Sequence, residues 1–319
     1  MNIIKDLNSE VPDTNAYYFR LDELSDSSSK DNLYTGYNSI HTNFMDGERQ
    51  VVLNVWMPTE FGQHQDHFGN NSVEYNKNAT EVYGVCPFTT EWLNEIDSER
   101  EYRYIFYPLN KKDIPPVMTK KYDACYFGGI HSLLHLYGLA ALFNFNYRYM
   151  SMTHGINWKT QDCLKFATDL DLSHQEKIKR VGECKISLCY NIVPIESSHL
   201  DAIKSYPRWE DNKAFADVHS LGYIPQFKSR MHEAALARTL NLVYKDPWNI
   251  AEEYYTPDEE FVYFNSNEDL PDKIDEILNN WDSYEGVVDR AYNKALNYTT
   301  ENMMQIIEKG EVWNPHNVD

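Results

Sequence analysis

The sequence predicts an α/β protein with two domains, each built on a largely parallel sheet. Apolar segments of strand length recur along the chain, the clearest being Arg49–Trp56 and Tyr122–Phe127. Nearly unbroken apolar runs are typical of strands that a parallel sheet buries on both faces. Segments with helical character follow several of these strands, among them His131–Phe143 and Ser173–Val181. This alternation of strand and helix in both halves favours two Rossmann-like domains.

Length and composition limit the class of protein. A chain of 319 residues is long enough for two domains, and 42% hydrophobic with 14% aromatic residues indicates a folded protein. The formal net charge of −20 opposes general binding to nucleic acid backbones, because that binding depends on Lys and Arg neutralising phosphates.

The cysteines and the hydropathy of the sequence indicate the cellular compartment in which we expect the protein. The chain has five cysteines and no C-x-x-C motif, so we expect buried reduced thiols rather than a disulfide framework or zinc ribbon. The first residues lack the apolar core of a signal peptide, and the most apolar run, Leu136–Phe143, is too short to span a bilayer. We therefore expect a cytoplasmic protein without a membrane span, in the host cytoplasm if the chain is viral.

The first half begins with a segment, Tyr17–Leu21, that fits a strand, followed by a polar loop. The first clear strand, Arg49–Trp56, ends at a turn that leaves Glu60 just beyond it. Ligands bind at this carboxyl end of strands in open α/β sheets, so Glu60 is a candidate site residue. The further elements expected in this half are a strand over Glu81–Cys86, a helix over Pro87–Asn94 and a strand over Tyr102–Tyr107.

The loop after Glu60 carries His64, Asp66 and His67. Two histidines and a carboxylate within four residues lack the spacing of a helical metal site, so a plain surface loop explains them as well. Acceptor binding or general-base chemistry is the functional alternative, with His64 the second candidate after Glu60.

A charged, proline-containing segment, Leu109–Pro116, is typical of an interdomain linker. After it comes the strand Tyr122–Phe127, a turn at Gly128 and Gly129, and the helix over 131–143. A strand, glycines and a helix start favour phosphate binding, although an ordinary βα turn has the same pattern. A further strand is expected over Asn146–Ser151.

The middle of the chain contains a capping box, Ser173-His-Gln-Glu176, which predicts a helix through Val181. The D-x-D sequence Asp169-Leu-Asp171 leads into this helix without following a clear strand, and we therefore do not assign it a divalent metal. A buried strand is expected over Lys185–Tyr190, followed by an irregular insertion over 192–222.

The segment Pro225–Trp248 predicts a loop, a short helix and a buried strand over Leu240–Val243. Ser229 is the expected N-cap, accepting a hydrogen bond from a backbone N–H. Lys228 and Arg230 flank the helix start, where a diphosphate is favoured, and Glu233 lies one turn inside. A carboxylate there can accept both hydrogen bonds of a ribose diol. Solvated basic residues and a carboxylate that complements the helix dipole are the alternative interpretation.

The C-terminal part predicts a strand over Phe261–Phe264 and three helices. Ile274, Ile277, Leu278 and Trp281 have the spacing of one amphipathic helix. Val287–Leu296 predicts a second helix, and a third begins at Thr299.

Several of these segments resemble the GT-B glycosyltransferases, particularly the group-1 and spore-maturation-protein-like families. Lys228-Ser-Arg-Met-His-Glu-Ala-Ala235 looks like their donor-site helix, in which a Glu holds the nucleotide ribose. Many relatives carry a second Glu eight positions earlier, where this chain has Pro225. Asn54–Phe61 and Cys86–Asn94 resemble units of their first domain.

The resemblance implies a metal-independent transferase that moves a sugar from a nucleotide diphosphate donor, with a UDP-sugar favoured and no cofactor. Lys228, Arg230, Gly128 and Gly129 are then expected at the diphosphate, Glu233 at the ribose, and Glu60 and His64 at the reacting hydroxyl. It also implies an acceptor-side domain over residues 1–108, a nucleotide-sugar domain over 109–290 and a helical tail over 291–319 that crosses back to the first domain. The acceptor is expected to be a glycan or another hydroxyl compound, and retention of configuration is slightly favoured over inversion.

Three alternatives remain open. A phage or viral enzyme of the same type would glycosylate hydroxymethylated DNA. A non-catalytic module would bind the nucleotide sugar without turnover. A phosphate-handling Rossmann enzyme outside sugar transfer is the third, although the glycine fingerprint of nucleotide-binding folds is missing.

Overall fold

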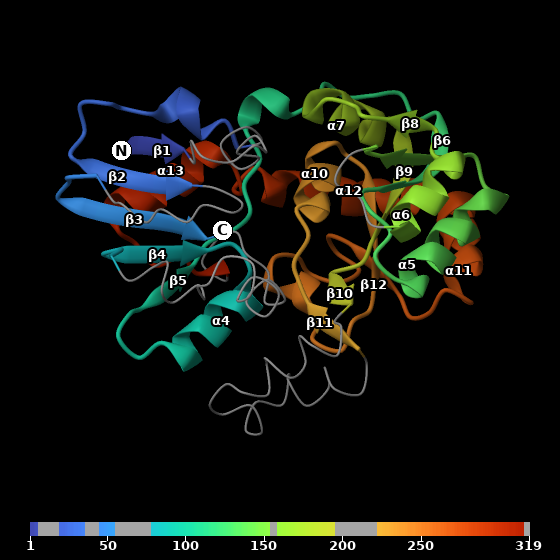
Figure 1. The fold of residues 1–319 in the computed structure, drawn as a ribbon. Helices are drawn as coiled ribbons and strands as arrows, with labels where there is room; N and C mark the ends of the chain where they lie inside the picture. The colour runs from blue at the N-terminus through green and yellow to red at the C-terminus, as the bar shows by residue number, and fades with distance from the viewer. Residues whose placement is uncertain (6–18, 36–44, 55–77, 154–157, 195–221, 316–319) are drawn as a thin grey trace.

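The computed structural model of the protein describes residues 1–5, 19–35, 45–54, 78–153, 158–194 and 222–315. Within these residues two parallel sheets lie side by side, each with helices packed against it (Figure 1). The segment 105–121 connects the sheets. The α/β fold class predicted from strand–helix alternation is confirmed.

The first sheet has five described strands, all parallel, in the order β1-β2-β3-β4-β5. The strands are β1 (Asn2–Lys5), β2 (Asp31–Thr35), β3 (Arg49–Asn54), β4 (Glu81–Gly84) and β5 (Tyr102–Tyr104). The helix α4 (Pro87–Ile96) connects β4 and β5. The short strand β1 was not predicted, since four residues give too little pattern to separate a strand from a loop.

The second sheet is parallel throughout its described strands, in the order β13-β12-β9-β6-β7-β8. Its strands are β6 (Tyr122–Phe127), β7 (Tyr147–Ser151), β8 (Asp169–Leu170), β9 (Cys184–Cys189), β12 (Leu240–Tyr244) and β13 (Val262–Phe264). Chain order runs outward from β6 in one direction and from β9 in the other. This reversal is the hallmark of a doubly wound sheet, and ligands bind at the carboxyl ends of the strands beside it.

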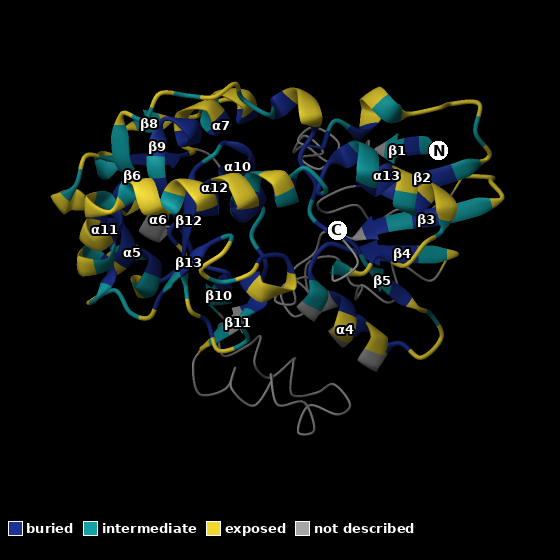
Figure 2. Ribbon diagram, turned by 180° about the vertical axis from the view of Figure 1, so that it is seen from behind, coloured by how far each residue is buried: buried dark blue, intermediate teal, exposed yellow. Residues whose placement is uncertain are grey.

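Helices cover both faces of this second sheet, and Figure 2 shows its strands buried between them. On one face lie α7 (His174–Gly182) and α10 (Arg230–Leu236), whose apolar residues join the core that also contains the first sheet. On the other face lie α5 (Leu133–Ala141) and α11 (Leu270–Asn279). The helix α12 (Trp281–Ala295) contributes residues to both cores.

Shorter elements complete the described fold. They are the 3-10 helices η1 (Leu21–Leu24), η2 (Lys111–Asp113), η3 (Leu142–Asn144), η4 (Leu164–Phe166) and η5 (Ile250–Glu253), the helix α6 (Trp158–Cys163), and the antiparallel pair β10 (Ile192–Pro194) and β11 (Tyr223–Pro225).

The C-terminal helix α13 (Thr300–Lys309) returns to the first sheet, as the fold prediction stated. Met303, Met304 and Ile307 are buried in the core that contains the strands of that sheet. Arg49 on β3 donates to the carbonyls of Ile307 (2.7 Å) and Glu308 (3.1 Å) at the end of the helix. A cation placed there satisfies carbonyls that lack partners within the helix. The C-terminal helix is therefore packed against the sheet that the N-terminal part of the chain forms.

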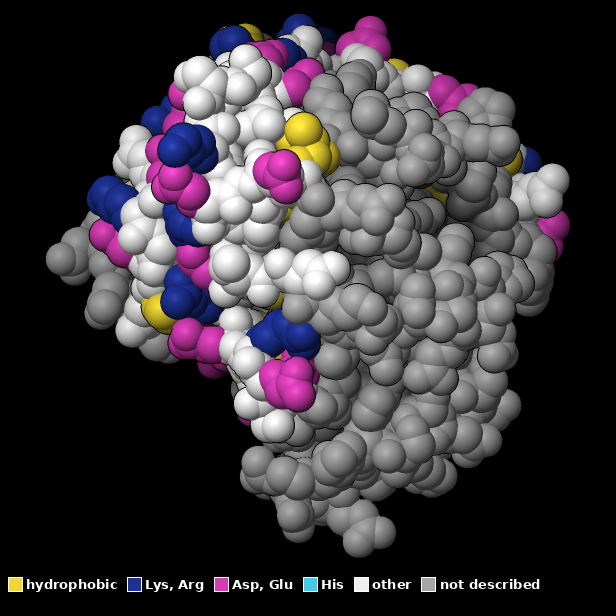
Figure 3. All heavy atoms as spheres, turned by 60° about the vertical axis from the view of Figure 1, so that its left-hand side comes forward, with side chains coloured by type: hydrophobic (Ala, Val, Ile, Leu, Met, Phe, Trp, Pro, Cys, Tyr) yellow, Lys and Arg dark blue, Asp and Glu magenta, His cyan; other side chains and the backbone are white. Residues whose placement is uncertain are grey.

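Charged side chains alternate in sign on the described part of the face in Figure 3. Around the first sheet, Lys30 pairs with Glu48 at 2.8 Å and Arg103 with Glu81 at 2.9 Å. Basic groups that are paired in this way are poorly suited to neutralising a row of phosphates.

Two sequence predictions about individual elements were wrong. Leu21 begins the 3-10 helix η1 and so does not end a strand over Tyr17–Leu21. Ile274 and Trp281 lie on different helices, because α11 ends at Asn279 and α12 begins at Trp281. The apolar spacing continued across the break because both helices bury residues in the same core. The helix α12 runs through residues 290 and 291, and the predicted domain boundaries stay predictions.

Candidate active site

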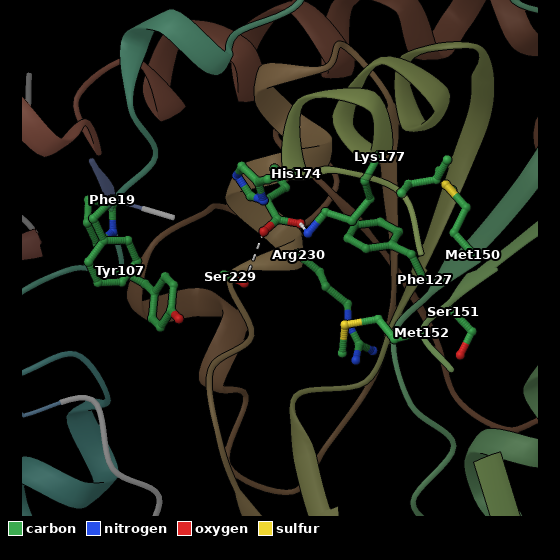
Figure 4. A pocket seen from close by; sticks show the side chains of 14 residues that line it. Phe19, Tyr107, Phe127, Met150, Ser151, Met152, His174, Lys177, Ser229 and Arg230 are labelled. Carbon is green, nitrogen blue, oxygen red and sulfur yellow. Dashed lines mark hydrogen bonds and ion pairs between the residues drawn. The ribbon is translucent and has the colours of Figure 1, made fainter. Parts of the chain in front are cut away.

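A cavity of about 230 Å³ lies at the carboxyl end of the second sheet, on the side that faces the first sheet (Figure 4). Its lining comes from both halves of the chain. Segments around the first sheet supply Phe19, Tyr107 and Pro108. The second sheet and its helices supply Phe127, Gly128, Met150, Ser151, Met152, Leu172, His174, Lys177, Ser229, Arg230 and Glu233.

The cavity lies where the strand order reverses. Gly128 directly follows β6, one of the two strands at the reversal, and lines the cavity with φ of +109°. Glycine adopts this conformation without the steric penalty of a Cβ atom. Gly129 is not among the lining residues; its carbonyl accepts a hydrogen bond from the Tyr126 hydroxyl at 2.9 Å. The turn therefore brings Gly128, rather than both glycines, to the cavity.

Arg230 extends its guanidinium across the cavity (Figure 4). Its Nη1 lies 3.2 Å from the Tyr126 hydroxyl, and its Cζ lies 5.2 Å from the centre of the Tyr126 ring. Burial disfavours the charged guanidinium, but Tyr126, Cys189 and Glu233 together outweigh burial, and the pKa of Arg230 lies above its usual value. Among the described residues, no carboxylate lies within ion-pair distance of Arg230. The cavity thus holds a positive charge that an anionic ligand can neutralise.

Glu233 lies one turn into α10 and is only 5% exposed. Its Oε2 lies 2.9 Å from the Nζ atom of Lys177, and its Oε1 accepts a hydrogen bond from the Ser229 hydroxyl at 3.3 Å. Burial raises the pKa of Glu233, but Lys177, His174 and Arg230 together outweigh burial, with Lys177 the largest of the three, and the net shift is downward. The cavity therefore presents a buried carboxylate that stays ionised.

The prediction that Ser229 caps the helix through its hydroxyl was wrong. Ser229 has helical dihedral angles, and its side chain accepts no capping hydrogen bond. The hydroxyl donates instead to Glu233, four residues on. Sequence reasoning assumed that the backbone was extended before Arg230, whereas the chain is already helical there.

His174 lies beside this carboxylate, at the first position of α7. Burial and the neighbouring charge of Lys177 lower the pKa of His174 to about 4. The imidazole is therefore neutral at physiological pH. It adds hydrogen-bonding capacity to the cavity without adding a second cation.

Lys228 lies close in sequence to the cavity but is not among its lining residues. Its backbone N–H donates to Asn191 Oδ1 at 3.0 Å, and its ammonium contacts Gln226 Oε1. Its expected role at a diphosphate stays a prediction.

The two carboxylates of the D-x-D sequence have protein partners. Asp169 accepts from Arg148 at 2.6 Å, and Asp171 accepts from the backbone N–H and hydroxyl of Thr153 at 2.7 and 2.6 Å. Asp169 also lies on the short strand β8, which sequence analysis did not detect. The acceptor-side candidates Glu60 and His64, together with Asp66 and His67, fall outside the described residues.

Sequence reasoning missed Lys177 and His174 because their helix precedes Glu233 by more than fifty positions in the chain. The capping box located the helix, but its inward face could not be assigned. Phe19 and Tyr107 were missed because the first half approaches this cavity only in the folded chain. In the described part of the chain, no helix is long and apolar enough to cross a bilayer.

Comparisons with known proteins bear on the family and the fold. Residues 153–309 match the model of a family described as glycosyl transferase-like. No curated protein matches the sequence. Among solved structures, TarM superposes with a TM-score of 0.53 at 12% identity, covering 92% of this chain and 57% of the TarM chain.

Two further structures match similarly. HepE from Anabaena, solved in complex with UDP-glucose, gives a TM-score of 0.54 at 11% identity and covers 82% of this chain and 71% of its own. Sucrose-phosphate synthase from Thermosynechococcus elongatus gives 0.53 at 10% identity, covering 81% and 66%. At such low identity these matches establish the fold, which is GT-B. The chain spans little more than half the length of TarM.

Proposed function

We propose that this chain, a glycosyltransferase of the group-1 type with the GT-B fold, transfers a sugar from a nucleotide diphosphate to an acceptor hydroxyl in the cavity between its two sheets. The observation that carries the proposal is that one cavity contains both a positive and a negative side chain. Arg230 is a cation without a carboxylate partner among the described residues, and Glu233 is a buried anion close to it. A nucleoside diphosphate has an anionic and a diol end that match these two groups.

The chemistry of the reaction explains the cation. Breaking the anomeric bond leaves negative charge on the diphosphate, and preorganised donors aimed at that charge lower the barrier. The guanidinium of Arg230 offers a planar set of N–H donors suited to phosphate oxygens. Lys228 and the N–H groups at the start of α10 would add positive charge, and Gly128 would let a phosphate approach the backbone. Metal independence is part of the proposal.

The donor is proposed to be a UDP-sugar, in line with the UDP-glucose bound in the HepE structure. Glu233 would accept hydrogen bonds from both ribose hydroxyls, since an ionised carboxylate has acceptor sites on each oxygen. The acceptor would be a glycan or another hydroxyl compound. Glu60 would act as base or acceptor ligand in an inverting reaction, with His64 the second candidate, and only as acceptor ligand in a retaining one.

Thermal-shift measurements against a panel of nucleotide sugars test the proposal most directly. A donor at a hundred times its dissociation constant should stabilise the protein by about 2.7 kcal/mol. UDP-sugars are expected to give the largest shift, and 2′,3′-dideoxy-UDP should bind more weakly than UDP. If no nucleoside diphosphate binds, or if the dideoxy nucleotide binds equally well, the assignment of this cavity is wrong.

Two follow-up assays separate the alternatives. Tight nucleotide binding without donor hydrolysis or transfer would indicate a binding module rather than an enzyme. Transfer to hydroxymethylated DNA, accompanied by a salt-dependent gel shift, would identify the DNA-modifying alternative.

A further inference from the structure

The carboxylate of Glu233 is engaged on both oxygens by different kinds of partner. Ser229, on the same helix, contacts Oε1 through a neutral hydroxyl at 3.3 Å. Lys177, on α7, contacts Oε2 through a charged ammonium at 2.9 Å. The second contact compensates more for the burial of a negative charge, because the ammonium carries a full positive charge and the hydroxyl carries none.

Lys177 is held in place by its own helix. The capping box of Ser173 and Glu176 fixes the start of α7, and Ile178 and Val181 anchor the helix in the core. The ammonium also lies 5.5 Å from the centre of the Phe127 ring, at the end of β6. Lys177 thus approaches Glu233 from an element that the donor-helix sequence does not include.

We propose that Lys177 is a positioning residue that keeps Glu233 ionised and oriented for the ribose diol, and so sets the acid limit of donor binding. The inference rests on the proposed function, in which Glu233 is the ribose ligand. Lys177 itself is assigned no contact with the reacting atoms.

The groups around Glu233 determine whether loss of Lys177 raises or lowers the carboxyl pKa. The groups that influence its charge are Lys177 and His174 on α7 and Arg230 on its own helix, with the Cys189 thiol of β9 nearby. Burial favours the protonated acid, and the ammonium of Lys177 is the largest opposing influence. Removing that ammonium while leaving the burial should raise the carboxyl pKa toward the range known for buried acids. Glu233 would then be protonated at a pH where it is now charged.

The test measures UDP affinity by calorimetry from about pH 5 to about pH 8, between the ordinary carboxyl pKa and values found for buried carboxyls. The variants are Lys177→Met, which keeps an unbranched side chain one atom shorter and without the charge, and Lys177→Arg, which keeps a positive charge. Lys179→Met on the exposed side of α7 is the control for losing one lysine. Titration of the nucleotide phosphate, with a pKa of about 6, is common to all variants and cancels in the affinity ratios.

We expect the ratio of wild-type to Lys177→Met affinity to grow about tenfold for each pH unit below the raised carboxyl pKa. Lys179→Met should show a constant ratio, and Lys177→Arg should recover most of the wild-type profile. Ser229→Ala should change the pH dependence much less than Lys177→Met, because it removes a neutral donor and leaves the ammonium in place. In Lys177→Met/Glu233→Gln the pH dependence should disappear, since glutamine does not titrate.

Three outcomes would overturn the inference. One is a Lys177→Met profile parallel to wild type, although wild type still prefers UDP over dideoxy-UDP. The second is persistence of the pH dependence in the double variant, which would assign it to His174. The third is equal wild-type binding of UDP and dideoxy-UDP, which would reject the ribose assignment itself and so the proposed function. A carboxyl titration of Glu233 by NMR would then still report whether Lys177 controls its ionisation.

Discussion

The guanidinium of Arg230 occupies the space that a side chain at position 128 would need. An ideal Cβ atom placed on Gly128 would lie 2.2 Å from Nη2 of Arg230 and 2.8 Å from its Cζ. The two residues are more than a hundred positions apart in sequence and meet only because β6 and α10 converge on the cavity. Position 128 therefore favours glycine for two reasons: the turn has a positive φ there, and a side chain would clash with the guanidinium of Arg230.

Gly128→Ala should displace Arg230 and weaken UDP binding as well as reduce stability. Positive φ at a non-glycine residue is expected to cost about 1–3 kcal/mol. Gly222→Ala is the matched control, because Gly222 also has positive φ (+68°), but a Cβ atom added there would meet no described atom within 4 Å apart from its chain neighbours. Calorimetry of both variants measures the loss of UDP affinity, and urea denaturation measures the loss of stability. Equal loss of UDP affinity in both variants would show that displacement of Arg230 is not the cause.

Arg230→Ala should weaken UDP binding by about 1.5–3 kcal/mol, the contribution of a hydrogen bond to a charged group. Binding of uridine, which lacks the diphosphate, should change little. Arg238→Ala provides the control, because Arg238 pairs with Asp289 at 2.6 Å and does not line the cavity. Unchanged affinity of Arg230→Ala for UDP in calorimetry would remove Arg230 from the diphosphate site.

Glu60→Gln tests the acceptor side, which the described residues do not include. If Glu60 is a general base, turnover should fall about 10²–10⁴-fold, while UDP affinity should stay near wild type. The comparison with His64→Gln decides between the two candidates. Normal turnover with a lowered melting temperature would assign Glu60 a structural role, and a pH–rate profile would separate a base from an acceptor ligand.

Trp313→Ala should destabilise the junction between the C-terminal tail and the rest of the protein. The Trp313 ring is 9% exposed. It contacts four aromatic rings at centroid distances of 5.1 to 6.0 Å, those of Tyr104, Phe106, Tyr254 and Tyr298. Truncating a buried Trp costs about 3–5 kcal/mol. Val312→Ala is the control at a site that is 63% exposed. If urea denaturation showed that Trp313→Ala lowers the free energy of unfolding no more than Val312→Ala, Trp313 would not anchor the C-terminal tail.

The sequence identified the strands of the second sheet other than β8, because their apolar character is local. β6 was predicted with its observed limits, and β12 and β13 within a residue of theirs. The capping box at Ser173 and Glu176 was confirmed, since both of its hydrogen bonds form within one turn of helix. The helix α10 was also predicted from its local pattern, although its expected cap at Ser229 was wrong, and Arg230 and Glu233 both line the cavity.

Long-range relationships determined most of what the sequence missed, and the wrong Ser229 cap is a local exception. The segment β1 is a strand because it pairs with β2, and four residues alone do not reveal a partner thirty positions away. The break between Asn279 and Trp281 was hidden because two helices packed on one core continue the same apolar spacing.

The sequence by itself thus determined the α/β class, most strands of the second sheet and the helix that carries Arg230 and Glu233. Only the tertiary structure decided which strands are neighbours, that Lys177 reaches Glu233, and that Gly128 makes room for Arg230. The physical reason is the distance along the chain over which each signal acts. Apolar periodicity and caps act over a few residues, whereas the charge and shape of the cavity arise from side chains that chain folding brings together from distant positions.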